Sequence, residues 1–257
     1  MDLGIRGKVA LVVGASGGIG EAVALALAAE GVSLAIAARR EDELRRVADL
    51  ATRSGAAGAK TFALDLTEAA SIPAIAARIR DAAGDPDIVV LNGGGPKPGR
   101  FTDVAIADWD EAYQKILRGM LELVNALLPA MRAKKWGRIV ALASTSVKQP
   151  IDNLVLSNAF RTALVSALRT LAVEVARDGV TINSIATGRV YTDRLRALYG
   201  GNDDEMQRTA ASEVPIGRVA TPQEFAPLVA FLCGEPAGYV TGQTISIDGG
   251  LTRGLFG

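Results

Sequence analysis

A glycine-rich stretch near the amino end, Leu11-Val-Val-Gly-Ala-Ser-Gly-Gly-Ile-Gly20, places the tightest constraint on the fold. It follows a short apolar run, Val9 to Val13, that predicts a buried strand. It precedes a segment, Glu21 to Ala29, whose composition favours a helix. The turn contains three glycines: Gly14, Gly18 and Gly20. Such a turn lets the backbone approach a pyrophosphate, with the first N–H groups of the helix pointing at the anion. The alternative is a tight strand-to-helix turn that binds nothing.

The length and charge of the chain exclude several classes of protein. Its 257 residues permit one large α/β domain or two small ones, and the absence of linkers or repeats favours one. Lysine plus arginine equals aspartate plus glutamate, 28 each, so neither a nucleic acid nor a membrane surface is an expected partner. The first residues lack the apolar region typical of a signal peptide, so we expect none; no apolar run reaches about 20 residues, and Cys233 is the single cysteine. We therefore expect a cytoplasmic protein without disulfides.

The chain contains no histidine. This excludes Ser-His-Asp hydrolysis, a histidine-ligated zinc and any histidine general base, and we expect no metal site. Chemistry must then come from serine, tyrosine, lysine, arginine, carboxylates or a bound cofactor.

Apolar runs and helix-forming segments alternate along the chain, which predicts βαβ units and a parallel sheet. The predicted strands are 9–13, 33–38, 61–66, 87–91, 138–142, 180–185 and 243–247. The predicted helices are 21–29, 41–54, 69–83, 108–134, 157–177 and 221–233. The polar segment 189–214 indicates a mobile loop or a helical lid.

The end of the second predicted strand bears on cofactor choice. An NAD-binding unit usually places a carboxylate there to bond the ribose 2′-hydroxyl, but this chain has Ala38 followed by Arg39 and Arg40. A guanidinium binds a 2′-phosphate in bidentate fashion, so NADP(H) is favoured over NAD(H). The alternative is that both arginines begin a solvated helix. Asp65, at the exit of the third strand, can meet an adenine amino group or cap the next helix.

Further short motifs follow the glycine turn in a fixed order: Asp65-Leu66, Asn92-Gly93-Gly94, Gly137-Arg-Ile-Val140, Val180-Thr-Ile-Asn183, Thr187-Gly188 with Thr192, Thr241-Gly242-Gln243 and Asp248-Gly249-Gly250. Together they resemble the short-chain dehydrogenase/reductase family, and within it the β-ketoacyl-[acyl carrier protein] reductase-like group. The resemblance covers nearly the whole chain.

The resemblance implies a Rossmann-type, doubly wound parallel sheet of about seven strands with helices on both faces. It implies a single domain over 1–257, with a lid over the substrate at about 188–214, and a homo-oligomer, dimer or tetramer, built on the two long helices. It also implies that a nicotinamide dinucleotide is bound by Gly14, Ser16, Gly18, Ile19, Gly20, Arg39, Arg40, Asp65, Leu66, Asn92, Gly93, Arg161, Gly188, Val190 and Thr192.

The family's chemistry uses an asparagine, a serine, a tyrosine and a lysine, of which this chain keeps the serine, Ser144. Ser157 stands at the tyrosine position, Arg161 at the lysine position and Ile116 at the asparagine position. A serine hydroxyl is far less acidic than a phenol of pKa about 10, and its side chain is shorter. Arg161 keeps its proton at physiological pH. The usual proton relay is therefore impaired.

Three interpretations stay open. The first is a reductase of a ketone or 3-oxoacyl substrate with a displaced acid: Tyr191, Lys97, Lys148 or water. For each side chain the alternative is an ordinary solvated loop residue. The second is a catalytically inactive nucleotide-binding homologue that acts as a sensor or an assembly partner. The third is a reductase whose substrate brings its own acid or needs none.

Overall fold

The computed structural model describes residues 1–254. Seven parallel strands form one sheet in the order β3-β2-β1-β4-β5-β6-β7. The strands are β1 Val9–Val13, β2 Ser33–Ala38, β3 Gly58–Ala63, β4 Ile88–Leu91, β5 Gly137–Leu142, β6 Val180–Thr187 and β7 Thr244–Ile247. This order, with a reversal between β1 and β4, is the predicted doubly wound fold.

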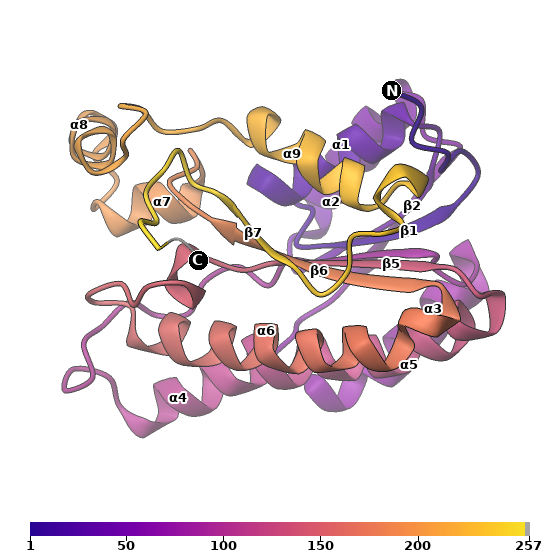
Figure 1. Cartoon of the computed structure of the whole chain (residues 1–257), viewed down its shortest axis with the longest axis horizontal. Helices are drawn as coiled ribbons and strands as arrows, with labels where there is room; N and C mark the ends of the chain where they lie inside the picture. The colour runs from indigo at the N-terminus through magenta and orange to yellow at the C-terminus, as the bar shows by residue number, and fades with distance from the viewer. Residues whose placement is uncertain (255–257) are drawn as a thin grey trace.

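Helices cover both faces of the sheet (Figure 1). One layer consists of α1 Gly18–Ala29, α2 Glu41–Arg53 and α9 Pro222–Leu232. The opposite layer consists of α3 Ile72–Ala83, α4 Ile106–Ala112, α5 Gly119–Lys134 and α6 Val155–Val175. No helix within residues 1–254 is long and apolar enough to cross a lipid bilayer.

The strands bury both of their faces, so successive residues enter two different cores. Leu11 of β1 packs with α3, α5 and α6, whereas its neighbour Val12 packs with α1 and α9. Both side chains are fully buried. This arrangement explains why the strands are continuous apolar runs rather than alternating ones.

Two predicted elements differ from the structure. The third strand covers Gly58–Ala63 rather than 61–66, and it pairs with β2 from Ser33 to Ala38. The helix predicted over 108–134 is divided by a π-helical segment, Tyr113–Arg118, between α4 and α5. Gly119 follows this segment, and a Cβ there would lie 2.4 Å from the Leu66 carbonyl oxygen. The π-helical segment therefore ends where the helix packs closely on the backbone of Leu66. Hydrophobic periodicity in the sequence does not reveal such an irregularity.

The segment predicted to be a lid contains two helices, α7 Asp193–Leu198 and α8 Asp203–Glu213. They share a small apolar cluster of their own: Leu195, Met206, Ala210 and Val219, with Tyr199 packed against it. Thr192 begins α7 by accepting a hydrogen bond from the Leu195 N–H at 3.2 Å. Asn202 begins α8 in the same way through the Glu205 N–H.

Candidate active site

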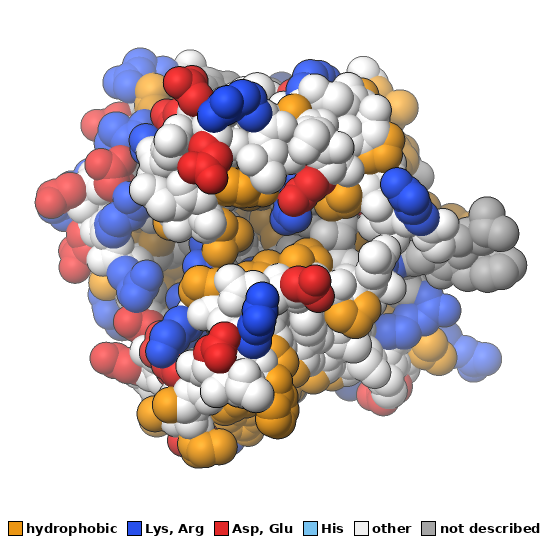
Figure 2. All heavy atoms as spheres, turned by 90° about the vertical axis from the view of Figure 1, so that its left-hand side faces the viewer, with side chains coloured by type: hydrophobic (Ala, Val, Ile, Leu, Met, Phe, Trp, Pro, Cys, Tyr) orange, Lys and Arg blue, Asp and Glu red, His pale blue; other side chains and the backbone are white. Residues whose placement is uncertain are grey.

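A cavity of about 480 Å³ lies at the carboxyl ends of the strands. Its wall combines the glycine turn after β1, the ends of β2, β4, β5 and β6, the start of α6 and the segment that leads into α7. Figure 2 faces the side of the molecule that carries α7 and α8, and shows a hollow rimmed by hydrophobic and charged side chains. In open α/β sheets, ligands bind in this crevice at the reversal of strand order.

The glycines of the turn are required by close backbone contacts. Gly14 has a φ of +67°, and a Cβ there would lie 2.3 Å from the Asn92 carbonyl oxygen. A Cβ at Gly20 would lie 2.2 Å from the Gly14 carbonyl oxygen. The Asn92 side chain donates a hydrogen bond to that same oxygen at 3.3 Å. Asn92 therefore fastens the turn to the end of β4.

Beyond this contact, the turn exposes the start of α1 to the cavity. Gly17, Gly18 and Ile19 line the cavity, and α1 begins at Gly18. The first N–H groups of a helix have no intrahelical acceptor, and with the helix dipole they favour an anion. The segment leading into α7 lies directly above: a Cβ at Gly18 would lie 3.1 Å from the Thr192 Cγ2.

The end of β2 adds positive charge to this part of the cavity. The Arg40 guanidinium donates to the Ser16 hydroxyl at 3.3 Å and to the Ser16 carbonyl oxygen at 3.0 Å. Arg39 is exposed beside it, and Ala38 supplies no carboxylate. Arg40 is thus fixed on the glycine turn, and its remaining N–H groups are free to bind a phosphate group.

Asp65 caps the chain that follows β3. Its Oδ1 accepts hydrogen bonds from the Thr67 N–H at 3.0 Å and the Thr67 hydroxyl at 2.8 Å. Burial alone would raise the pKa of this carboxyl group, but the Thr67 bonds and the charges of Arg39 and Lys115 outweigh it and lower the pKa. Asp65 is therefore ionised at neutral pH, caps the turn and still lines the cavity.

Almost all of the predicted nucleotide-binding residues share this one cavity. They are Gly14, Ser16, Gly18, Ile19, Arg39, Arg40, Asp65, Leu66, Asn92, Gly93, Arg161, Gly188, Val190 and Thr192. Gly20 is the exception, because it is buried beneath the turn against Gly14.

Ser144, Ser157 and Arg161 line the opposite end of the cavity. The Ser144 hydroxyl accepts a hydrogen bond from the Ser146 N–H at 3.1 Å, which leaves its own proton free to donate. Ser157 is 4% exposed, and its hydroxyl lies 3.3 Å from that of Ser146. The hydroxyl of Ser157 is therefore engaged with a neighbouring side chain.

Arg161 joins the ends of two strands. Its guanidinium donates to the Leu142 carbonyl oxygen at 2.8 Å and to the Gly94 carbonyl oxygen at 2.5 Å. Burial and the nearby charge of Arg194 lower the pKa of Arg161 to about 10, so it stays charged at neutral pH. Two N–H groups make these bonds, and three remain for a ligand.

The structure does not bring the expected displaced acids to the cavity. Tyr191 is 39% exposed, and its hydroxyl donates to Asp203 at 3.3 Å because the side chain turns toward α8. Lys97 instead pairs with Asp108 at 2.9 Å. Neither residue belongs to the cavity wall, and neither does Lys148.

Sequence reasoning missed three cations that do line the cavity: Lys115, Arg194 and Arg189, the last of which pairs with Glu213 at 2.6 Å. Lys115 belongs to the π-helical segment, and its ammonium group donates to the Gly95 carbonyl oxygen at 3.2 Å. Burial and the charge of Arg39 lower its pKa. The adjacent Ile116, at the expected asparagine position, is 2% exposed. The irregular helix thus coincides with a lysine, rather than an asparagine, in the cavity wall.

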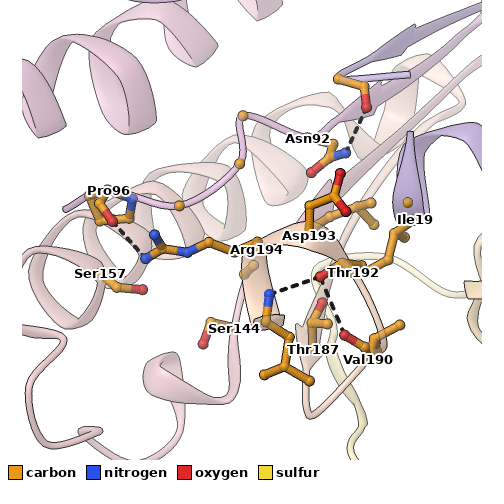
Figure 3. A pocket seen from close by; sticks show the side chains of 18 of the residues that line it. Ile19, Asn92, Pro96, Ser144, Ser157, Thr187, Val190, Thr192, Asp193 and Arg194 are labelled. Atoms are coloured by element: carbon orange, nitrogen blue, oxygen red, sulfur yellow. Dashed lines mark hydrogen bonds between the residues drawn. The ribbon is translucent and has the colours of Figure 1, made fainter. Parts of the chain in front are cut away.

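Arg194 lies two residues after Thr192, a predicted nucleotide-binding residue. This nearness in sequence is the signal that could have identified Arg194 as a cavity residue. Its guanidinium donates to the Pro96 carbonyl oxygen at 2.6 Å, and Figure 3 shows the side chain extending from α7 toward Pro96. Within residues 1–254, no cluster of three or more histidine, cysteine or acidic side chains is arranged to hold a metal ion. The donor set of this cavity fits a phosphorylated organic ligand instead: helix-start N–H groups and arginines at one end, and hydroxyls with further cations at the other.

Known proteins share both the sequence and the fold. The family described as enoyl-(acyl carrier protein) reductase matches residues 14–252. The 3-oxoacyl-[acyl-carrier-protein] reductase FabG of Escherichia coli K12 is 33% identical over 249 residues, covering 97% of this chain and 99% of FabG. The crystal structure of L-sorbose reductase from Gluconobacter frateurii, complexed with NADPH and L-sorbose, superposes with a TM-score of 0.92 at 32% identity and covers 99% of this chain and all of that one.

A further solved structure is also similar. An NADPH-bound short-chain oxidoreductase from Pseudomonas aeruginosa PAO1, described as containing an atypical catalytic centre, gives a TM-score of 0.88 at 27% identity, with 96% and 97% of the two chains covered. The matched region of this chain includes the glycine turn, both ends of the cavity and the segment that carries α7 and α8. The chain therefore belongs to the short-chain dehydrogenase/reductase family of NAD(P)-dependent oxidoreductases.

Proposed function

We propose that this protein binds NADPH along the cavity and reduces the carbonyl group of a small organic substrate to an alcohol. One observation carries the proposal: a single cavity has an anion-binding glycine turn with Arg40 at one end and a free serine hydroxyl, Ser144, at the other. NADPH-bound relatives of this fold support it. The 3-oxoacyl carbonyl group is one candidate substrate, as in FabG.

The preference for NADPH rests on charge at the end of β2. Arg39 and Arg40 present two guanidinium groups beside Ser16, without a carboxylate to repel a 2′-phosphate. Arg40 is already oriented by its two bonds to Ser16, so little side-chain freedom is lost when it binds a phosphate.

Replacing Arg40 by glutamine is expected to weaken NADPH binding about tenfold or more, since a charge-assisted hydrogen bond contributes roughly 1.5–3 kcal/mol. Binding of NADH, which lacks the 2′-phosphate, should change little. Fluorescence titration of both nucleotides measures the two affinities. Arg53→Gln is the matched control, because Arg53 is exposed on α2 and does not line the cavity. An equal loss for both nucleotides would contradict the assignment of Arg40.

NADPH held in this cavity would supply the hydride for the carbonyl carbon, and the protein or solvent would supply the proton that completes the alcohol. The Ser144 hydroxyl donates a hydrogen bond to the carbonyl oxygen as negative charge develops there. Arg161 holds ribose hydroxyls with its free N–H groups, and Ser157 supports the hydroxyl of Ser146. The segment 188–214 covers the substrate.

The proton is assigned to Lys115. The other cations of the cavity wall are arginines. A lysine ammonium group releases its proton far more easily than an arginine guanidinium group. The pKa of Lys115 is lowered by burial and by Arg39, which makes it a better acid than an ordinary lysine. Tyr191, Lys97 and Lys148, the side chains that the sequence offered as alternative acids, do not line the cavity.

A second function, nucleotide binding without turnover, is favoured by one observation: no tyrosine lines the cavity within residues 1–254. A sensor or an assembly partner needs only the glycine turn and the arginines. Tight NADPH binding without oxidation by any carbonyl compound distinguishes this function from the reductase.

We expect a homo-oligomer, dimer or tetramer, built on α5 and α6. One exposed apolar side chain on α6 is consistent with a buried contact there: Val173 is 73% exposed in the single chain. Sedimentation velocity measures the state directly, and a monomer at micromolar concentration would contradict the expectation.

A further inference from the structure

The substrate end of the cavity carries an excess of positive charge. Six cationic side chains line the cavity, against two carboxylates, Asp65 and Asp193, and one of the six, Arg189, is already paired with Glu213 at 2.6 Å. Arg39 and Arg40 lie at the β2 end, where the phosphates are expected. Lys115, Arg161 and Arg194 lie around the loop that follows β4. None of these three makes a salt bridge within residues 1–254.

The three cations contact consecutive backbone carbonyl groups of that loop. Arg161 donates to Gly94 at 2.5 Å, Lys115 to Gly95 at 3.2 Å and Arg194 to Pro96 at 2.6 Å. Carbonyl oxygens orient the cations but carry no net charge. Burial lowers the pKa of each of the three groups. The positive charge of Arg194 also repels those of Lys115 and Arg161 and lowers their pKa further. A group of like charges in a partly buried site is costly without an anion.

Arg194 has the most defined position. Its guanidinium lies against the backbone of Gly95, where a Cβ would come within 2.4 Å of Nε and 2.7 Å of Cζ. Glycine at this position therefore makes room for the guanidinium group. Figure 3 shows Arg194 extending toward Pro96, on the side of the cavity that also holds Ser157, while the Asp193 carboxylate lies on the side of Asn92 and Ile19. One N–H bonds Pro96, and four remain for a ligand.

We propose that the substrate is an oxo acid, whose carboxylate is bound by the Arg194 guanidinium while its ketone oxygen meets Ser144. The inference rests on the proposed function, since it names the substrate class of the same site. A planar guanidinium fork matches a carboxylate in bidentate fashion. Arg161 and Lys115 add positive potential around the same anion. Because α7 carries Arg194, binding the carboxylate also holds the segment 188–214 against the loop after β4.

The test compares matched charged and neutral carbonyl compounds. The probes are acetoacetate and 2-oxobutyrate, each with its methyl ester, and dihydroxyacetone phosphate with dihydroxyacetone. Isothermal titration calorimetry of the protein saturated with NADP⁺ measures binding independently of turnover, and NADPH oxidation measures kcat/KM. We expect each oxo acid to bind, and to be reduced, at least tenfold better than its ester, because a charge-assisted bond to arginine is lost in the ester.

Arg194→Met should abolish this preference by lowering oxo-acid affinity about 10- to 100-fold, with little effect on the esters. Arg208→Met is the matched control, since Arg208 is an exposed arginine on α8 outside the cavity wall. Unchanged nucleotide titration and unfolding temperature show that the Arg194 variant is folded and binds cofactor.

Equal binding of acid and ester, or an undiminished preference in Arg194→Met, would overturn the proposal. Preference for dihydroxyacetone phosphate alone would also overturn it, in favour of a phosphorylated substrate. Failure of NADPH to bind contradicts the proposed function instead. The nucleotide titration therefore separates the two failures.

Discussion

Replacing Gly14 by alanine is expected to lower the free energy of unfolding by about 2–5 kcal/mol, the sum of backbone strain and a steric clash. Gly14 has a φ of +67°, which a residue with a Cβ adopts only at a cost, and that Cβ would lie 2.3 Å from the Asn92 carbonyl oxygen. Because the glycine turn and the end of β4 cannot then keep their contact, NADPH binding should be lost as well. Urea denaturation and nucleotide titration measure the two effects.

Gly7 provides the matched control for this variant. It has a φ of +77°, but nothing lies within 4 Å of the position of a Cβ. Gly7→Ala therefore carries the backbone strain without the clash and should cost only about 1 kcal/mol. If both variants lose equal stability, the close approach between Gly14 and Asn92 does not constrain the turn.

Replacing Lys115 by methionine is expected to lower kcat about 10²- to 10⁴-fold, which is the typical contribution of a general acid. Lys115→Arg keeps the positive charge but releases no proton, so it should not restore the rate. Thermal unfolding and NADPH affinity should stay close to wild type, which separates loss of the proton from loss of the site. Tyr191→Phe is the control, because the Tyr191 hydroxyl contacts Asp203 outside the cavity.

The pH dependence of the rate gives the same hypothesis a second readout. A proton donor acts in its protonated form, so kcat should fall as the pH rises through the pKa of Lys115. Burial and Arg39 lower that pKa, so the fall should occur below the usual lysine value of about 10.4. Recovery of the rate by Lys115→Arg, or a large loss in Tyr191→Phe, would contradict the assignment.

Local sequence rules located the strands, except for the bounds of β3, and the residues that follow them. The turn from Gly14 to Gly20, the arginines after β2 and the Asn92 loop each follow directly from a strand, and parallel strands end at one edge. The position of these residues after a strand is therefore enough to predict that they lie at one edge of the sheet, whichever way their side chains point. The structure accordingly brings almost all of them to one cavity.

The substrate end was less predictable because it depends on side-chain direction and on an irregular helix. Tyr191 is close in sequence to the end of β6, yet its side chain turns to Asp203. Lys115 lines the cavity from a π-helical segment that a regular helical period cannot anticipate. Arg194 reaches the loop after β4 from 98 residues further along the chain.

We propose that this cavity reduces a carbonyl group with NADPH although, within residues 1–254, no tyrosine lines it. The most direct measurement is the stoichiometry of NADPH oxidised to alcohol formed, by absorbance and product chromatography, with the wild-type protein and a panel of oxo acids and ketones. We predict one alcohol per NADPH, with a rate that falls sharply in Lys115→Met and not in Tyr191→Phe. Tight NADPH binding without alcohol from any member of the panel would contradict it and leave the nucleotide-binding function without turnover.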